Sequence, residues 1–383
     1  MDKPLVSVII PAYNHGKYIE NCLDSIINQT YNDIELIILN DGSTDDTNEK
    51  IIGYENILRK RFKRYEYINK ENEGVCKTLN RGINISKGEY LIIFASDDIM
   101  YPERISRQVE FLEQNKEYGM VFVDGYHIES DEYFDINNVN TDGLLFSKRM
   151  QNEYFHVNDR YDSDLLFTRD MENMIDDLFD FMLHNVYLMP APGVCFRKSC
   201  FEKVGLYDEN IESEDLDMFI RMAKYYKYSF IKEPLVLHRY HKNNSGRSHI
   251  IVDTLKSLIN KYSESDLLNE EQRMIVVSLF ERKLGIFKLE NINNKIKNRK
   301  IIVWGTGSSY ENFKNTYNIE IDFFIDSNPN KQGIILDNKE VSAPSRLLKI
   351  NKDEYYILVL SQFYKEIYNE LKKYGFLYMK HYY

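Results

Sequence analysis

The chain has 383 residues, of which 43% are hydrophobic and 28% are charged, and its formal net charge is −11. This length allows two or three domains, and the acidic balance argues against general nucleic-acid binding, which needs a basic surface. No apolar run reaches the roughly 20 residues that span a bilayer, and no signal peptide is visible. The four cysteines lack a CxxC pair or zinc spacing, so we expect reduced thiols in a cytoplasmic protein.

Strand and helix signals alternate from residue 4 to about residue 125. Short apolar, β-branched runs predict strands, and apolar residues at helical spacing predict helices. The strands are expected at 6–10, 34–39, 65–68 and 90–94, and the helices at 14–28, 44–58 and 75–85. Ser43 or Thr44 would cap the second helix. Repeated strand–helix units imply an α/β fold with a mostly parallel, doubly wound sheet.

The rest of the chain divides into three segments. Residues 126–180 are acidic and weakly periodic, which predicts an irregular insertion that serves as an acceptor loop or lid. Residues 250–297 have a helical pattern throughout. Residues 298–383 show the alternating signals of a small α/β unit, with strands expected at 301–304, 321–325 and 356–360 and a final helix at 365–374. We therefore expect a first domain over 1–249, a helical bridge over 250–297 and a small α/β domain over 298–383.

Two adjacent carboxylates follow the fourth predicted strand. The apolar run 90–94 leads through Ala95 and Ser96 to Asp97 and Asp98. Open α/β sheets bind ligands at the carboxyl ends of their strands, and oxygen ligands favour Mg²⁺ or Mn²⁺, which accompany phosphates. Solvated turn aspartates are the alternative, but neighbouring carboxylates repel each other unless a cation or hydrogen bonds compensate. The segment predicts a metal-dependent enzyme acting on a diphosphate-bearing substrate.

Polar motifs also follow the first and second predicted strands. Pro11 and Tyr13 could pack against a planar base, although an ordinary turn capped by Asn14 explains the same residues. Asp41 could accept a hydrogen bond from a base N–H, whereas helix capping explains the polar residues that follow it. Either motif alone is compatible with a purely structural role.

Two further clusters lie between residues 212 and 245. Asp215 would begin a helix, where the helix dipole favours an acidic residue, and it could instead serve as general base for a sugar hydroxyl. Downstream, residues 238–242 contain two histidines, an arginine and a lysine, which could supply a metal ligand and diphosphate contacts. A lone histidine is usually structural, but this cluster lies downstream of an acidic site that needs counter-charges.

Taken in order, these motifs resemble the family 2 glycosyltransferases with a GT-A fold. The resemblance covers about residues 4–248. The matching segments are 6–14, 40–45, 72–74, 80–82, 87–90 leading into 96–98, 204–209 and 214–215. Their order and spacing are far more specific than any single motif. The resemblance implies a mixed α/β sheet, an inverting transfer reaction and Mn²⁺ or Mg²⁺ as cofactor.

The resemblance also implies roles for individual residues. Asp215, beside Glu214, would be the catalytic base that takes the proton of the attacking acceptor hydroxyl. Asp97, Asp98 and His241 would hold the metal, which stabilises charge on the leaving diphosphate. The residues expected to bind the nucleotide sugar are Pro11, Tyr13, Asn14, Asp41, Asn72, Gly74, Lys77, Ser96, Asp97 and Arg239.

Ala95 stands where the family usually has the first aspartate of its DxD motif, so Asp97 would be the main metal ligand. The resemblance implies a UDP-sugar donor and transfer of a hexosyl or N-acetylhexosaminyl group. The implied acceptor is a growing or lipid-linked bacterial surface glycan (capsule, O-antigen or lipooligosaccharide), which would bring the enzyme to the inner face of the membrane. The alternative is a catalytically weak sugar-nucleotide-binding or scaffold protein of the same fold.

The C-terminal segment resembles the small Rossmann-like modules of polysaccharide-biosynthesis enzymes. Gly305 and Gly307 follow one predicted strand and Asp326 follows the next, which is the outline of a dinucleotide site. Tyr310 stands in place of the third glycine, and the unit is too short for a full dinucleotide fold. A structural, oligomerisation or acceptor-orienting role is therefore preferred, with an NAD-dependent enzyme as the alternative.

Overall fold

The structure is a computed structural model of the chain. It describes residues 3–128, 179, 182–183, 191–211, 214–239, 241, 250–283, 296–361, 367, 370–371, 373–376 and 381–382. The chain divides into two compact units, Met1–Leu268 and Asn269–Tyr383. This boundary falls inside the segment 250–297 that was predicted as a helical bridge. Within the described ranges, no helix combines the length and apolar composition needed to cross a bilayer.

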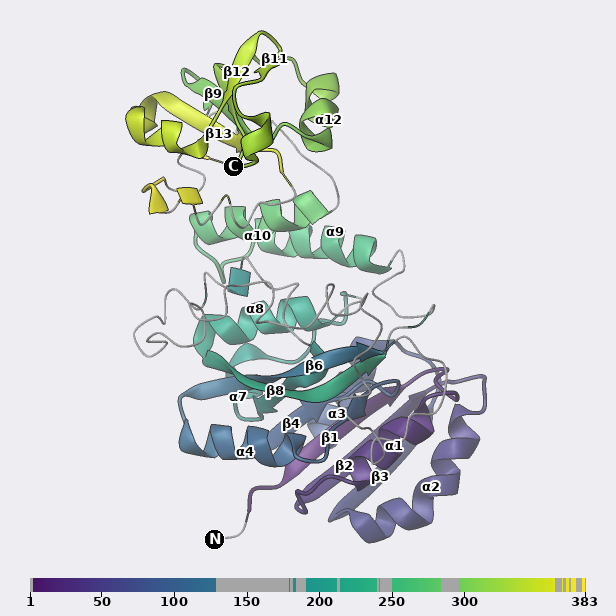
Figure 1. The fold of residues 1–383 in the computed structure, drawn as a ribbon. Helices are drawn as coiled ribbons and strands as arrows, with labels where there is room; N and C mark the ends of the chain where they lie inside the picture. The colour runs from purple at the N-terminus through teal and green to yellow at the C-terminus, as the bar shows by residue number, and fades with distance from the viewer. Residues whose placement is uncertain are drawn as a thin grey trace. The chain divides into compact units, whose positions relative to one another are not determined.

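A mixed sheet forms the centre of the first unit, with β1, β2 and β3 side by side in its N-terminal part (Figure 1). In sheet order the described strands are β3 (Arg64–Lys70), β2 (Ile34–Asp41), β1 (Val6–Ala12), β4 (Tyr90–Ile93), β7 (Val194–Arg197), β6 (Tyr118–Ile128), β8 (Lys227–Arg239) and β5 (Ile99–Met100). The first four are parallel, β7 is antiparallel to β4 and β6, and β5 is antiparallel to β8. The prediction of a doubly wound, mixed α/β sheet is confirmed.

Helices connect and flank these strands. In chain order they are α1 (Ile19–Ile27), α2 (Thr47–Arg61), α3 (Val75–Ile85), α4 (Arg104–Gln114), α7 (Cys200–Val204), α8 (Asp215–Tyr225) and α9 (Ile250–Ser263), with a 3-10 turn at Ala191–Gly193. The predicted start of α1 at residue 14 is wrong, because Asn14 has a φ of 53°, outside the helical region. The predicted cap of α2 is also wrong, since Ser43 and Thr44 bond to Asn14 and the helix begins later.

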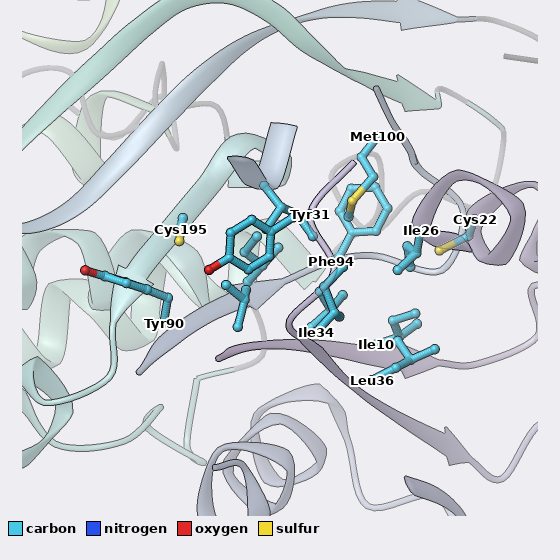
Figure 2. Close-up of a cluster of buried hydrophobic side chains, with 14 of the residues drawn as sticks. Ile10, Cys22, Ile26, Tyr31, Ile34, Leu36, Tyr90, Phe94, Met100 and Cys195 are labelled. Atoms are coloured by element: carbon cyan, nitrogen blue, oxygen red, sulfur yellow. The ribbon is translucent and has the colours of Figure 1, made fainter. Parts of the chain in front are cut away.

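Apolar side chains fix the strands that lead into the site. All eight residues of β2 are buried, as expected for an interior parallel strand covered on both faces. Figure 2 shows part of this core, in which Ile10 of β1 and Leu36 of β2 lie near Cys22 and Ile26 of α1. Because α1 packs on the core in this way, the loop that precedes it is held over the carboxyl end of β1.

The second unit contains a smaller sheet. In sheet order its described strands are β11 (Ile335–Leu336), β12 (Lys339–Ser342), β10 (Phe323–Ile325), β9 (Lys300–Trp304) and β13 (Tyr355–Val359), all parallel except β11. Its described helices are α10 (Glu270–Lys283) and α12 (Ser308–Thr316), with 3-10 turns at Pro329–Lys331, Pro344–Lys349 and Lys352–Glu354. The strands near 301, 323 and 356 were predicted from the sequence. Half of the helix predicted at 365–374, and most of the insertion predicted at 126–180, lie outside the described residues.

Candidate active site

The carboxyl ends of β1, β2 and β4 meet at one edge of the sheet. β1 pairs with β2 on one side and with β4 on the other, so the winding direction of the sheet changes at β1. Open α/β sheets bind their ligands at such a switch point. The loops that leave this edge contain most of the residues predicted to bind the donor.

Hydrogen bonds join the loops that follow β1 and β2. The Asn14 N–H donates to Ser43 Oγ at 2.9 Å, and Asn14 Oδ1 accepts from the Thr44 N–H at 2.8 Å. The Gly16 N–H donates to Asp45 Oδ2 at 2.9 Å. Asparagine tolerates left-handed backbone because its short polar side chain bonds locally. Asn14 therefore fixes one loop against the other, and its predicted contact with the nucleotide stays a prediction.

Asp41 connects the end of β2 to the start of α3. Its buried carboxylate accepts the N–H groups of Glu73 at 2.9 Å and Gly74 at 3.1 Å. It also pairs with the ammonium group of Lys70 at the end of β3. These contacts hold the segment before α3 close to the edge of the sheet. The nucleobase is predicted to bind at this edge.

The remaining residues predicted to bind the nucleotide are more accessible. Tyr13 is 48% exposed, Asn72 and Lys77 are exposed, and Pro11 is half-buried. Gly42 adopts a φ of +74°, and a Cβ at this position would lie 2.7 Å from the Asn72 nitrogen. The close approach of the two loops at this glycine therefore excludes a side chain.

A histidine, an aspartate and a second histidine come together beside β4. His15 precedes α1, Asp97 follows β4, and His241 follows β8. The His241 Nε2 lies 2.9 Å from Asp97 Oδ2, and the His15 Nδ1 lies 3.7 Å from Asp97 Oδ1. Candidate ligand atoms of the three residues all lie within 4.8 Å of one another. The predicted metal residues Asp97 and His241 are thus brought together, and His15, which the sequence reading did not single out, joins them.

The charges in this group favour an ionised Asp97 and a neutral His15 imidazole. Burial opposes ionisation of Asp97, yet the hydrogen bond with His241 and the nearby His15 and His238 hold its pKa below the usual value. Burial lowers the pKa of His15, and the charge of Asp97 only partly offsets that effect. Metal ligation requires an ionised carboxylate and unprotonated imidazole nitrogens, so the donor set fits a divalent cation.

Asp98 and Arg239 lie next to this group in a different role. The Arg239 N–H donates to Asp98 Oδ1 at 2.9 Å, and Arg239 Nε donates to the Asp97 carbonyl oxygen at 3.1 Å. The Arg239 guanidinium is buried 5.0 Å from the Tyr18 ring centroid and also donates to Asn21. These contacts give both residues a part in holding the ends of β4 and β8 together. The predicted roles of Asp98 as a metal ligand and of Arg239 as a diphosphate contact stay predictions.

Glu214 and Asp215 form a second acidic group. Glu214 is the N-cap residue of α8 and Asp215 is its first residue, where the helix dipole favours negative charge. Both side chains are half-buried, and burial raises the pKa of each, that of Asp215 further because Glu214 is its neighbour. The same two carboxylates, together with burial, raise the pKa of the Cys76 thiol in α3 to about 12. The predicted catalytic pair is therefore next to α3.

A buried network anchors α8. Asp217 accepts hydrogen bonds from Tyr262 OH at 2.9 Å and from Arg221 Nε at 2.7 Å, and its carboxylate lies 2.7 Å from Lys261 Nζ. Lys261 Nζ also contacts Asp208 at 2.8 Å. Because Lys261 and Tyr262 belong to α9, this helix holds the turn of α8 that carries the predicted catalytic pair.

In the second unit, Asp326 is already engaged by protein groups. Its carboxylate accepts from the Thr306 hydroxyl at 2.5 Å and from the Asn328 N–H at 2.9 Å, and it lies 3.2 Å from Lys331 Nζ. These bonds stabilise the turn after β10. The Rossmann-like identity of this unit stays a prediction.

Comparisons with known proteins agree with this geometry. Residues 7–174 match the family described as glycosyl transferase family 2, and residues 297–380 match a family described as C2185-like, N-terminal. An uncharacterized glycosyltransferase of Rickettsia prowazekii is 25% identical over 309 residues, which cover 78% of this chain and 86% of that protein. Chondroitin synthase of Pasteurella multocida is 35% identical over 137 residues, 36% of this chain and 14% of the synthase.

Among solved structures, S. aureus TarS 1-349 in complex with UDP-GlcNAc has a TM-score of 0.50 and 16% sequence identity. The similarity covers 76% of both chains. At this identity the likeness concerns the fold alone. With the family match and the sheet order described above, it follows that the N-terminal unit has the GT-A fold and contains, over residues 7–174, a domain that matches glycosyl transferase family 2.

Proposed function

We propose that the chain is a metal-dependent, inverting glycosyltransferase that moves a hexosyl or N-acetylhexosaminyl group from a UDP-sugar to a hydroxyl of a growing bacterial surface glycan. One observation carries the proposal. A carboxylate favoured in its ionised form, Asp97, lies between two imidazoles at the carboxyl edge of a GT-A sheet. The UDP-GlcNAc complex of the TarS structure and the polymer synthases among the relatives support a UDP-sugar as the first donor to test.

On the acceptor side, Asp215 would act as the general base. It would take the proton from the acceptor hydroxyl as the oxygen attacks the anomeric carbon, and the bond to the diphosphate oxygen would break on the opposite face. This single displacement inverts the anomeric configuration. The raised pKa of Asp215 suits this role, because a general base works best when its pKa is close to the working pH.

On the donor side, Asp97 and His241 would hold the divalent cation. When bound, Mn²⁺ or Mg²⁺ would supply positive charge to the leaving diphosphate. Pro11, Tyr13 and Asp41 would surround the base. The other residues proposed to form the donor site are Asn14, Asn72, Gly74, Lys77, Ser96 and Arg239. Of these, Arg239 would act through the buried contacts that fix Asp97.

The test is transfer and hydrolysis of a panel of UDP- and GDP-sugars by the full chain, with Mn²⁺, with Mg²⁺ and with EDTA. We expect turnover of a UDP-sugar that EDTA abolishes. Asp97→Ala should lose both UDP binding with the cation and turnover, whereas Asp215→Asn should keep binding and lose turnover. Asp253→Asn is the matched control, because Asp253 is an exposed aspartate of α9.

Two results would overturn the proposal in different ways. Activity that is indifferent to EDTA and to Asp215→Asn would remove the metal and base assignments. Binding of UDP with no turnover of any sugar donor would favour the scaffold alternative, for which Ala95 in place of the usual aspartate is the motivating residue.

A further inference from the structure

We infer that His15 is a third protein ligand of the cation at Asp97 and His241, and that this ligand set selects first-row transition ions such as Mn²⁺ or Co²⁺ over Mg²⁺. The inference depends on the proposed function only in requiring that a cation binds here. It adds to the proposed metal site a third ligand, His15 from the loop after β1, and a preference among divalent cations that follows from the imidazole nitrogen of that ligand.

The position of His15 supports ligation. Its Nδ1 lies 3.7 Å from Asp97 Oδ1, while His241 Nε2 lies 2.9 Å from the other carboxylate oxygen. The three residues come from separate loops, and their candidate ligand atoms lie within 4.8 Å of one another. Two atoms bound to one ion at about 2.1 Å each lie at most about 4.2 Å apart, so small side-chain movements would complete the site.

Aromatic packing orients both imidazoles. The His241 ring stacks on Tyr18 with centroids 4.7 Å apart and an interplanar angle of 29°, and the His15 ring meets His241 edge-on at 5.6 Å. Ser96 Oγ lies 2.7 Å from His15 Nδ1. A hydroxyl can rotate, so Ser96 can release this nitrogen to the cation.

The composition of the ligand set argues for a transition ion. Ala95 contributes no side-chain oxygen, and Asp98, whose Oδ1 accepts the Arg239 N–H, is not part of the group whose ligand atoms lie within 4.8 Å of one another. Among the described residues, the cluster therefore offers two nitrogens and a single carboxylate. Mg²⁺ is bound through oxygen and gains little from imidazole, whereas imidazole suits first-row transition ions. Three protein ligands would leave positions open for the diphosphate oxygens.

The experiment measures the binding of metal alone to the full chain. We would titrate EDTA-treated protein with Mn²⁺, following free Mn²⁺ by electron paramagnetic resonance, and with Mg²⁺ in competition. The wild type should bind Mn²⁺ more tightly than Mg²⁺. His15→Gln should weaken Mn²⁺ binding by at least about 10-fold, the lower bound seen when even an outer partner of a metal ligand is lost. His15→Asp should narrow the preference for Mn²⁺ over Mg²⁺, because it exchanges nitrogen for oxygen.

His238→Gln is the matched control, because His238 is a histidine of β8 close to Asp97 that lies outside the cluster. It should change Mn²⁺ binding far less than His15→Gln. Pulsed electron paramagnetic resonance of the wild-type Mn²⁺ protein, labelled with ¹⁵N-histidine, counts coordinated imidazoles without any variant. Two are expected, and one would overturn the inference even if His15→Gln failed to fold.

The possible failures can be told apart. If the wild type binds Mn²⁺ and His15→Gln binds it equally well, or if His238→Gln weakens binding as much as His15→Gln does, His15 is not the third ligand, and the proposed function stands. A wild type that prefers Mg²⁺ overturns the metal preference. If the wild type binds neither ion and EDTA leaves sugar transfer unchanged, the metal-dependent part of the proposed function also fails.

Discussion

Arg239 and Asp98 are joined by a hydrogen bond of 2.9 Å from the main-chain N–H of Arg239 to Asp98 Oδ1. Burial, together with the neighbouring Asp97, raises the pKa of Asp98 well above its ordinary value. The pKa of Asp98 is therefore shifted in the opposite direction to that of the neighbouring Asp97, which is favoured in its ionised form. Since Arg239 lies two residues before His241, the bond holds the segment that brings His241 to Asp97.

Replacing Asp98 separates this positioning role from direct ligation. Asp98→Ala should leave the buried Arg239 N–H without its acceptor and lower the free energy of unfolding by about 1–3 kcal/mol. It should also weaken Mn²⁺ binding by about 10- to 100-fold, as the loss of an outer partner does. Asp98→Asn keeps an oxygen acceptor and should bind nearly as well as wild type. Urea unfolding and Mn²⁺ titration check both effects. If Asp98→Asn weakened Mn²⁺ binding as much as Asp97→Asn does, Asp98 would instead be a ligand of the cation.

The acidic limb of the pH–rate profile should report Asp215. As a general base it works only when deprotonated, so kcat/KM should rise as the pH increases through its raised pKa, above the range of an exposed aspartate. Glu214→Gln removes the neighbouring negative charge and should move this limb to lower pH. Burial remains, so the limb should stay above the ordinary aspartate range. The measurement is kcat/KM against pH for both proteins, and an unmoved limb would assign it to another group.

The sequence predicted the parts of the fold that depend on local pattern. The strands that became β1, β2 and β4 are continuous apolar runs, and Asp97 could be placed at the sheet edge from such a run alone. β8 could not be predicted in this way, because it pairs with β6 through register shifts and contains Pro234. Such irregular pairing is set by tertiary contacts.

One helix of the fold and one residue of the site were missed for different reasons. α4 carries Ile105, Val109 and Leu112 at helical spacing, a signal that was available in the sequence. His15 had only a weak signal, a histidine directly after the motif that ends in Asn14. His15 becomes a candidate metal ligand only together with His241. His241 lies far along the chain and reaches Asp97 only when β8 is in place.

Tyr262 should affect turnover through α8 without touching the donor site. Tyr262→Phe removes the hydroxyl that donates to the buried Asp217 at 2.9 Å. A bond to a charged group contributes about 1.5–3 kcal/mol, although Lys261 and Arg221 remain as partners of Asp217. We expect a several-fold lower kcat with little change in UDP and Mn²⁺ affinity, and calorimetry beside steady-state kinetics measures both.

The control for this variant is Tyr225→Phe, because Tyr225 is also in the α8 region but is 45% exposed. It should behave as wild type. If Tyr262→Phe weakened UDP binding as much as it lowered kcat, α9 would act on the whole first unit and not on the turn that carries Asp215.

Asn14 offers a graded test of the loop contact between β1 and β2. Residue 14 needs a side chain that tolerates a φ of 53° and an oxygen that accepts the Thr44 N–H at 2.8 Å. Asn14→Asp keeps both properties, and Asn14→Gly keeps only the tolerance of left-handed backbone. Asn14→Ala keeps neither property, and the left-handed backbone costs it about 1–2 kcal/mol. Stability and UDP affinity should therefore fall in the order Asp, Gly, Ala, whereas Asn56→Ala on the exposed face of α2 should change neither. An equal loss of UDP affinity in all three Asn14 variants would show that the amide itself contacts the nucleotide, because only that role needs the amide nitrogen.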